Sequence, residues 1–128
     1  MTDAGILTKI SPRSVADTVT RFTGILGAKR VRVFDVIDQA AAAREVGQEL
    51  RDTTLVIFGS PAAGTPVMAA APLAALDLPL KVLIWDDAGQ TKVTYVAPAE
   101  LAARYQLGPD LEKNLEAINP LTDALVAP

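Results

Sequence analysis

A predicted hairpin constrains the fold of this chain more than any other feature of its sequence. Two short apolar runs, Leu80–Trp85 and Thr91–Val96, flank the link Asp86–Gln90, which contains two aspartates and a glycine. A short link of this composition between two strand-like runs is typical of a β-hairpin. The two strands must therefore pair antiparallel, which favours an α+β fold over a doubly wound parallel sheet.

The chain upstream of the hairpin alternates between predicted strands and helices. The predicted strands are Ile6–Ile10, Arg30–Ile37 and Thr54–Phe58. Between the first two, apolar residues from Val15 to Leu26 recur at helical spacing, and Ser11-Pro12 is typical of an N-cap followed by a first-turn proline. Further helices are predicted after Asp38, after Pro98 and over Leu111–Ile118. We predict one domain over residues 1–128, with a single curved antiparallel sheet of about five strands.

Composition excludes several kinds of chemistry. The chain has 12 Lys and Arg against 15 Asp and Glu, a formal charge of −3, and contains neither His nor Cys. A Ser-His-Asp triad, a thiolate nucleophile, a disulfide and a His- or Cys-ligated zinc are therefore excluded, and we expect no metal and no cofactor. Mild acidity without a long basic run argues against a nucleic-acid partner. No apolar run is long enough to span a membrane and no signal-peptide pattern is present, so we expect a cytoplasmic protein.

The segment Gly59–Pro79 is unusually poor in charge, because Asp77 is its only charged residue. A segment that is apolar on every side must be covered on every side, by the protein's own core, by a second subunit or by a ligand. Pro66, Pro72 and Pro79 are expected to divide it into short turns. We predict a homodimer whose interface buries part of this segment.

The front of the same segment has the spacing of a phosphate-binding loop. Gly59 and Gly64 are separated by four residues, but Thr65 and Pro66 stand where the lysine and the magnesium-binding hydroxyl residue would be, so nucleotide hydrolysis and phosphate transfer are excluded. Backbone N–H groups at a helix start could still bind a small anionic or polar molecule. The predicted ligand-binding residues are Gly59, Ser60, Gly64 and Thr65, together with Gln39 and Arg51. In the alternative reading, Thr65 only caps a helix that starts at Pro66.

Three functional hypotheses remain open at this stage. The first is a non-catalytic dimeric module that binds a small ligand or anion at the Gly59–Thr65 loop. The second is an enzyme that uses Asp38 and Arg51 with a cation taken from solution. The third is a structural dimer without a ligand. The remaining aspartates are attributed to turns and caps, and Trp85 and Tyr95 are predicted to form a cross-strand aromatic pair.

Several short segments of the sequence resemble the bacterial family called domain of unknown function 302. They are Val33–Ala40, Val46–Arg51, Leu55–Pro61, Gly64–Met68 and Leu76–Asp87. The resemblance runs from about residue 6 to residue 107, which makes 109–128 a C-terminal helical extension. It implies a curved antiparallel sheet with helices packed against it, of the class shared with the TATA-binding-protein fold, and it implies dimers. It implies no activity.

Departures from the family pattern lie at the predicted site. Gln39 stands where members commonly have His, and Ser60 stands where they commonly have Asn. Tyr105 follows Arg104 where an Arg-His pair is common. Gln39 and Ser60 keep the capacity to form hydrogen bonds but do not titrate near neutral pH. These replacements favour a binding role over a catalytic one.

Overall fold

The fold is a five-stranded antiparallel sheet with helices packed against it, as predicted. A computed structural model describes residues 5–128. The strands are β1 (Ile6–Ser11), β2 (Arg32–Asp38), β3 (Thr53–Gly59), β4 (Leu80–Asp87) and β5 (Gln90–Val96). Their order across the sheet is β1-β5-β4-β3-β2, and every neighbouring pair is antiparallel. The hairpin predicted from the sequence is the β4–β5 pair, with Ala88 and Gly89 at its turn in positive φ.

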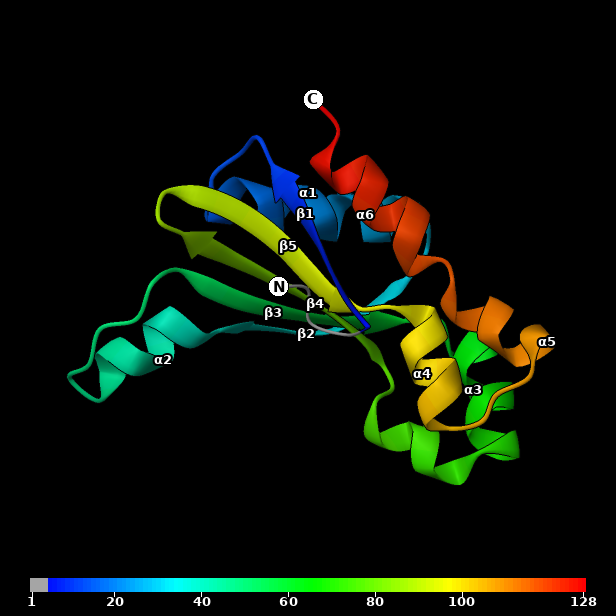
Figure 1. The fold of residues 1–128 in the computed structure, drawn as a ribbon. Coiled ribbons are helices and arrows are strands. Elements are labelled where there is room, and N and C mark those ends of the chain that lie inside the picture. The colour runs from blue at the N-terminus through cyan, green and yellow to red at the C-terminus, as the bar shows by residue number, and fades with distance from the viewer. Residues whose placement is uncertain (1–4) are drawn as a thin grey trace.

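The helices occupy one face and both ends of the sheet (Figure 1). They are α1 (Val15–Ala28), α2 (Gln39–Glu45), α3 (Pro61–Ala70), η1 (Pro72–Leu76), α4 (Pro98–Arg104), α5 (Pro109–Glu112), η2 (Lys113–Leu115) and α6 (Ile118–Val126). Helices α1 and α6 lie on the same face. The elements α3, η1, α4 and α5 form a lobe at one end of the sheet, and α2 lies at the other end. We refer to the first group as the α3–α5 lobe.

Helix α1 begins later than the sequence predicted. Its N-cap is Ser14, whose hydroxyl accepts a hydrogen bond from the backbone N–H of Asp17 at 3.1 Å. Ser11 instead ends β1, and its buried hydroxyl lies 2.8 Å from that of Thr18. Both serines satisfy the local rule for an N-cap, and the strand pairing of Ser11 with Thr91 decides between them.

The main hydrophobic core lies between the sheet and the α1–α6 layer. Alternate residues of β3, β4 and β5 point into it, as the period of a half-buried strand requires. Its fully buried members include Phe22, Leu26, Val56, Phe58, Val82, Ile84, Val93, Ile118 and Leu125. The rings of Phe22 and Phe58 meet edge to face with their centroids 5.2 Å apart, so α1 packs directly against the interior strand β3.

The C-terminal helix α6 contributes Ile118, Leu121 and Leu125 to this core. Lys9 of β1 donates hydrogen bonds to the carbonyl of Asn119 at 3.1 Å and to the hydroxyl of Thr122 at 2.6 Å. The guanidinium groups of Arg13 and Arg21 both donate to the carbonyl of Leu125, at 3.1 and 3.2 Å. The two arginines thereby satisfy the carbonyl of Leu125, one of the free carbonyls in the last turn of α6. The structured core therefore extends beyond residue 107, where the resemblance ended.

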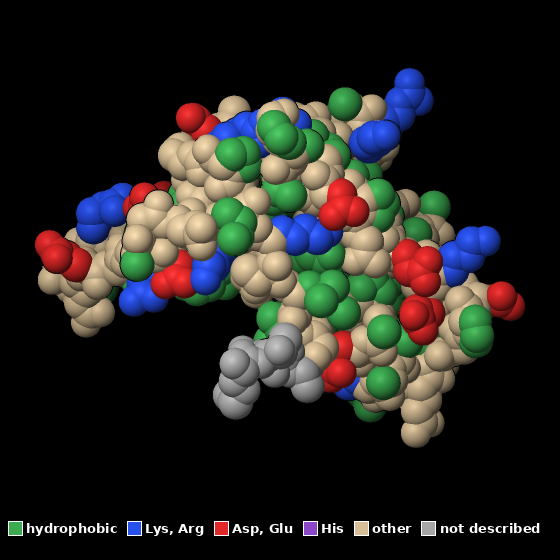
Figure 2. All heavy atoms as spheres, turned by 45° about the horizontal axis from the view of Figure 1, so that its top comes forward, with side chains coloured by type: hydrophobic (Ala, Val, Ile, Leu, Met, Phe, Trp, Pro, Cys, Tyr) green, Lys and Arg blue, Asp and Glu red, His purple; other side chains and the backbone are tan. Residues whose placement is uncertain are grey.

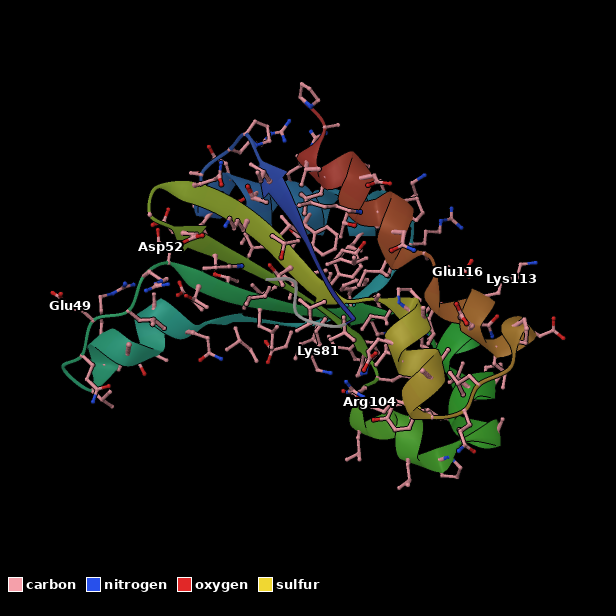
Figure 3. All side chains as sticks on the ribbon, viewed as in Figure 1. Glu49, Asp52, Lys81, Arg104, Lys113 and Glu116 are labelled. Carbon is pink, nitrogen blue, oxygen red and sulfur yellow. The ribbon has the colours of Figure 1, made fainter. Side chains whose placement is uncertain are left out.

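The opposite face of the sheet lies between α2 and the α3–α5 lobe (Figures 1 and 3). Trp85 and Lys92 are cross-strand partners on this face, with the Lys92 nitrogen 5.7 Å from the centre of the indole ring. Tyr95 points to the other face, where it is buried and donates to the amide oxygen of Asn119 at 2.8 Å. The predicted pair between Trp85 and Tyr95 is therefore wrong, because the β4–β5 register places them on opposite faces.

Candidate functional site

The predicted loop after β3 is the first turn of α3. The helix begins at Pro61, five residues before the predicted start, and Ser60 is its N-cap. The carbonyl of Ser60 accepts hydrogen bonds from the backbone N–H groups of Ala63 and Gly64, at 3.0 and 2.8 Å. These two N–H groups are therefore engaged in the helix and are not free to hold an anion. Thr65 and Pro66 lie inside the helix, so the alternative in which Thr65 caps a helix starting at Pro66 is also wrong.

A cavity with a volume of about 210 Å³ lies beside this turn. It is the space between the first turn of α3, the adjacent ends of the sheet strands, and η2. Its apolar wall includes Phe34, Pro61, Met68, Leu78, Pro79 and Leu115. Gly59, Ser60 and Gly64 also line it, so three of the residues predicted from the sequence meet here. Thr65 does not line it.

The two glycines in the wall leave space for the cavity, and neither adopts an unusual backbone conformation. Neither Gly59 nor Gly64 has a positive φ. A Cβ atom added at Gly59 would lie 3.6 Å from the Cβ of Pro79, and one added at Gly64 would lie 3.8 Å from the Cε of Met68. Both are ordinary van der Waals distances, so neither position requires glycine for its conformation. A larger side chain at either position would extend into the cavity.

The lining of the cavity contains two polar side chains, those of Ser60 and Asn114, and no charged residue. Asn114 of η2 donates a hydrogen bond from its amide nitrogen to the carbonyl of Ala63 at 3.1 Å, which fixes η2 against α3. The hydroxyl of Ser60 makes no helix-capping hydrogen bond. A cavity with an apolar wall and a few polar groups can orient a small organic molecule through those groups.

Gln39 and Arg51 lie at the opposite end of the β2–β3 pair. Gly59 is paired with Arg32 at one end of this ladder, and Thr54 is paired with Asp38 at the other. The five residue steps from Thr54 to Gly59 in an extended strand span about 17 Å. Gln39 opens α2 and Arg51 precedes β3, so a small molecule seated against Gly59 contacts neither of them. The six residues predicted as one site are therefore divided between the two ends of the sheet.

The residues of the enzyme hypothesis also have structural surroundings. Asp38 is the N-cap of α2, and its carboxylate accepts a hydrogen bond from the N–H of Ala41 at 2.9 Å. Arg51 lines a separate surface hollow with Arg44, Glu49 and Leu50. Figure 3 shows Glu49 and Asp52 at this end of the molecule, away from the α3–α5 lobe. Over residues 5–128, no group of three or more Asp, Glu, His or Cys side chains is placed to hold a metal ion.

A hydrogen-bonded cluster around Asp77 was not predicted from the sequence. The carboxylate of Asp77 accepts hydrogen bonds from the hydroxyl of Tyr105 and from the guanidinium of Arg104, the latter at 2.9 Å. The Tyr105 hydrogen bond is the main cause that lowers the pKa of Asp77, and Arg104 acts in the same direction. The same bond raises the pKa of Tyr105. The signal for this cluster in the sequence was that Asp77 is the one charged residue of the segment Gly59–Pro79.

This cluster fixes the outer part of the α3–α5 lobe. It joins the end of η1 to α4 beside a second small core formed by Val67, Ala74, Leu101 and Leu115. The charge-poor segment is thus partly covered by its own chain. The side of the segment that carries Leu73 and Leu76 of η1 is not covered, because these residues are 71% and 77% exposed.

Charge is mixed on the surface that Figure 2 presents. Acidic and basic side chains alternate there without forming a large patch of one sign. Over the described residues, no helix has the length and the apolar character needed to cross a membrane.

Comparison with known proteins gives a family and a fold. The family model "Domain of unknown function DUF302" matches residues 7–125, which includes nearly all of α6. A solved structure described as an uncharacterized conserved protein DUF302 from Bacillus stearothermophilus has a TM-score of 0.80 over 97% of both chains. Its sequence identity to this chain is 18%, so it supports the fold alone.

Two curated relatives are more similar in sequence. Proteins named "Fluoride-specific ion channel FluC 1" from Brucella suis biovar 1 (strain 1330) and Brucella abortus biovar 1 (strain 9-941) are each 39% identical over 107 residues. The match covers 83% of this chain but only 42% and 40% of those proteins. The chain therefore spans about two-fifths of the length of these relatives.

Proposed function

Because the chain belongs to the family Domain of unknown function DUF302, whose description assigns no activity, we propose a function from the geometry of the cavity. The protein is a non-catalytic, dimeric module that binds a small molecule between β3, α3 and η2. The observation that supports this proposal is the preformed cavity of about 210 Å³ with an apolar wall and two polar side chains, Ser60 and Asn114.

The cavity favours a ligand with an apolar body over a bare inorganic anion. No Lys or Arg is among its lining residues, and the N–H groups of Ala63 and Gly64 are already engaged within α3. An inorganic anion would lose its hydration there without gaining charged partners. An apolar group would displace water from Phe34 and Met68, which is favourable by about 25 cal/mol for each Å² buried.

A ligand screen by thermal denaturation tests this proposal. A compound present at a hundredfold excess over its dissociation constant stabilises the folded state by about 2.7 kcal/mol, which raises the melting temperature of a domain of this size by roughly 10 °C. The screen covers neutral, acidic and basic molecules of about six to twelve non-hydrogen atoms. A hit must disappear in Gly64→Leu, whose side chain extends into the cavity, while that variant keeps its circular dichroism spectrum. Binding that persists unchanged in Gly64→Leu would refute the cavity as the site.

The dimer is proposed to form through η1. Leu73 and Leu76 are large apolar residues that the rest of the described chain leaves exposed. A two-fold contact through this surface would bury them, and a specific interface of this kind covers about 1,200–2,000 Å² in total. Sedimentation at micromolar concentration should give twice the 13.5 kDa of one chain, and Leu76→Asp should return the mass to that of one chain. A wild-type chain that sediments as a monomer contradicts this part of the proposal.

The names of the curated relatives favour a second, related role. This chain matches about two-fifths of the length of proteins named fluoride-specific ion channels. We infer that a module of this kind is the ligand-binding part of such a longer protein. The screen therefore includes sodium fluoride against sodium chloride at equal ionic strength. A stabilisation specific to fluoride would favour fluoride itself as the ligand and would count against the apolar body inferred from the cavity.

A further inference from the structure

A basic side chain, that of Arg32, lies beside one residue of the cavity wall. Arg32 begins β2, and its Cα is the antiparallel partner of the Cα of Gly59. Directly paired residues project from the same face of a sheet, so the Arg32 side chain extends on the side where Gly59 leaves space. Its guanidinium carbon lies 5.5 Å from the centre of the Phe34 ring, which forms part of the cavity wall.

The charge of Arg32 is available to a ligand. In the part of the chain that the structure describes, no carboxylate forms an ion pair with it. Asp35, the nearest acidic residue along β2, accepts a hydrogen bond from the backbone N–H of Val36 at 2.8 Å. The 5.5 Å separation from the Phe34 ring is within the range of a cation–π interaction, which holds the guanidinium beside Phe34 while its N–H groups can still donate to a ligand.

Resting on the function proposed above, we propose that the ligand is a small organic acid, with its apolar body in the cavity and its carboxylate on Arg32. A dry apolar cavity of about 150 Å³ accommodates benzene. The cavity beside Gly64 is larger, about 210 Å³, so it fits a six-membered ring with a short substituent. The ring would pack against Phe34 and Met68, and the carboxylate at the rim would accept hydrogen bonds from the guanidinium of Arg32.

In this arrangement the apolar body of the ligand lies in the cavity and its carboxylate lies outside. An uncharged cavity lining is therefore compatible with an acidic ligand. The charged end remains at the surface, where its desolvation is limited, and only the apolar body enters the cavity. An exposed pair between a guanidinium and a carboxylate is weak, so its contribution to affinity is about fivefold and decreases as salt is added.

The test compares benzoate with benzamide, which has nearly the same shape and no charge. Both are titrated into the full chain labelled with ¹⁵N, and the amide signals of Gly59 and Gly64 report binding at the cavity. Benzoate is expected to bind about fivefold more tightly than benzamide at low salt. Arg32→Gln should remove this difference and leave the benzamide affinity unchanged. The matched control is Arg44→Gln in α2, which removes the same charge at the far end of the β2–β3 pair and should preserve the difference.

Each other result has a distinct meaning. If benzoate and benzamide bind equally at the cavity, and Arg32→Gln affects neither, the acid is refuted while small-molecule binding stands. If inorganic phosphate binds as tightly as benzoate, or if benzoate binds Gly64→Leu as tightly as wild type, the apolar body is not in the cavity and the inference is overturned. If neither benzoate nor benzamide changes the chemical shift of any amide, both the inferred acid and the proposed function are refuted.

Discussion

One glycine of the cavity wall, Gly64, leads to a quantitative prediction about stability. Gly64 lies inside α3 with an ordinary φ, and a Cβ atom there meets only Met68, at 3.8 Å. Glycine inside a helix is less favourable than alanine by about 0.5–1 kcal/mol, chiefly because the unfolded chain has more freedom to lose. Gly64→Ala should therefore stabilise the fold by about this amount.

The predicted gain can be compared with that at a helical glycine far from the cavity. Gly24 is exposed in α1, and a Cβ atom there meets nothing within 4 Å. Gly24→Ala is thus expected to give the same gain of about 0.5–1 kcal/mol. For a chain of this length the entropy of unfolding is about 270 cal/mol/K, so 1 kcal/mol corresponds to about 4 °C in melting temperature.

Urea denaturation at fixed protein concentration, followed by circular dichroism and by the fluorescence of the single tryptophan Trp85, measures both variants. Equal gains in the two variants would show that Gly64 is dispensable for folding, so that the open cavity is maintained at a cost in stability. If Gly64→Ala is destabilising while Gly24→Ala is stabilising, α3 requires glycine for packing and the cavity is a by-product of that requirement.

Three further predictions concern the α3–α5 lobe and the C-terminal helix. Because the pKa of Asp77 in the folded state lies below its ordinary 3.8, its ionisation stabilises the fold above that pH, and the contribution is lost as the pH falls through the folded value. The difference in urea midpoint between wild type and Tyr105→Phe should accordingly shrink between pH 5 and pH 3; a difference that does not change with pH would mean that Tyr105 acts only by packing. Leu125→Ala should destabilise by about 2–5 kcal/mol, since Leu125 is fully buried against the sheet. A chain ending at residue 107 should show no cooperative urea transition, and a cooperative transition in it would mean that α6 is an appendage after all.

The strands and the hairpin were predictable because their signals are local. The β-branched run of β3 and the Asp- and Gly-containing link between β4 and β5 determine strand and turn from neighbouring residues alone. Gly59, Ser60 and Gly64 were found for the same reason, since they are close together in the chain and meet at one turn of α3. The start of that helix was not predictable, because Pro61 and Pro66 are equally suited to a first turn. Packing decided between them, with Val67 buried and Asn114 bonded to the carbonyl of Ala63.

Contacts between distant parts of the chain were decided only by the tertiary structure. The antiparallel register of β2 with β3 sends Gln39 and Arg51 to one end of the sheet and brings Arg32 beside Gly59 at the other. Likewise Lys9 reaches α6, more than a hundred residues later in the sequence, and makes that helix part of the core. By itself the sequence determined the five strands, the hairpin and the positions of most helices. The predicted helix over Leu111–Ile118 was wrong, because the structure divides this stretch into α5, η2 and the first residue of α6. The sequence did not determine the partners across the sheet, because pairing depends on burying the apolar faces together, and that free energy is shared by all the segments that form the core.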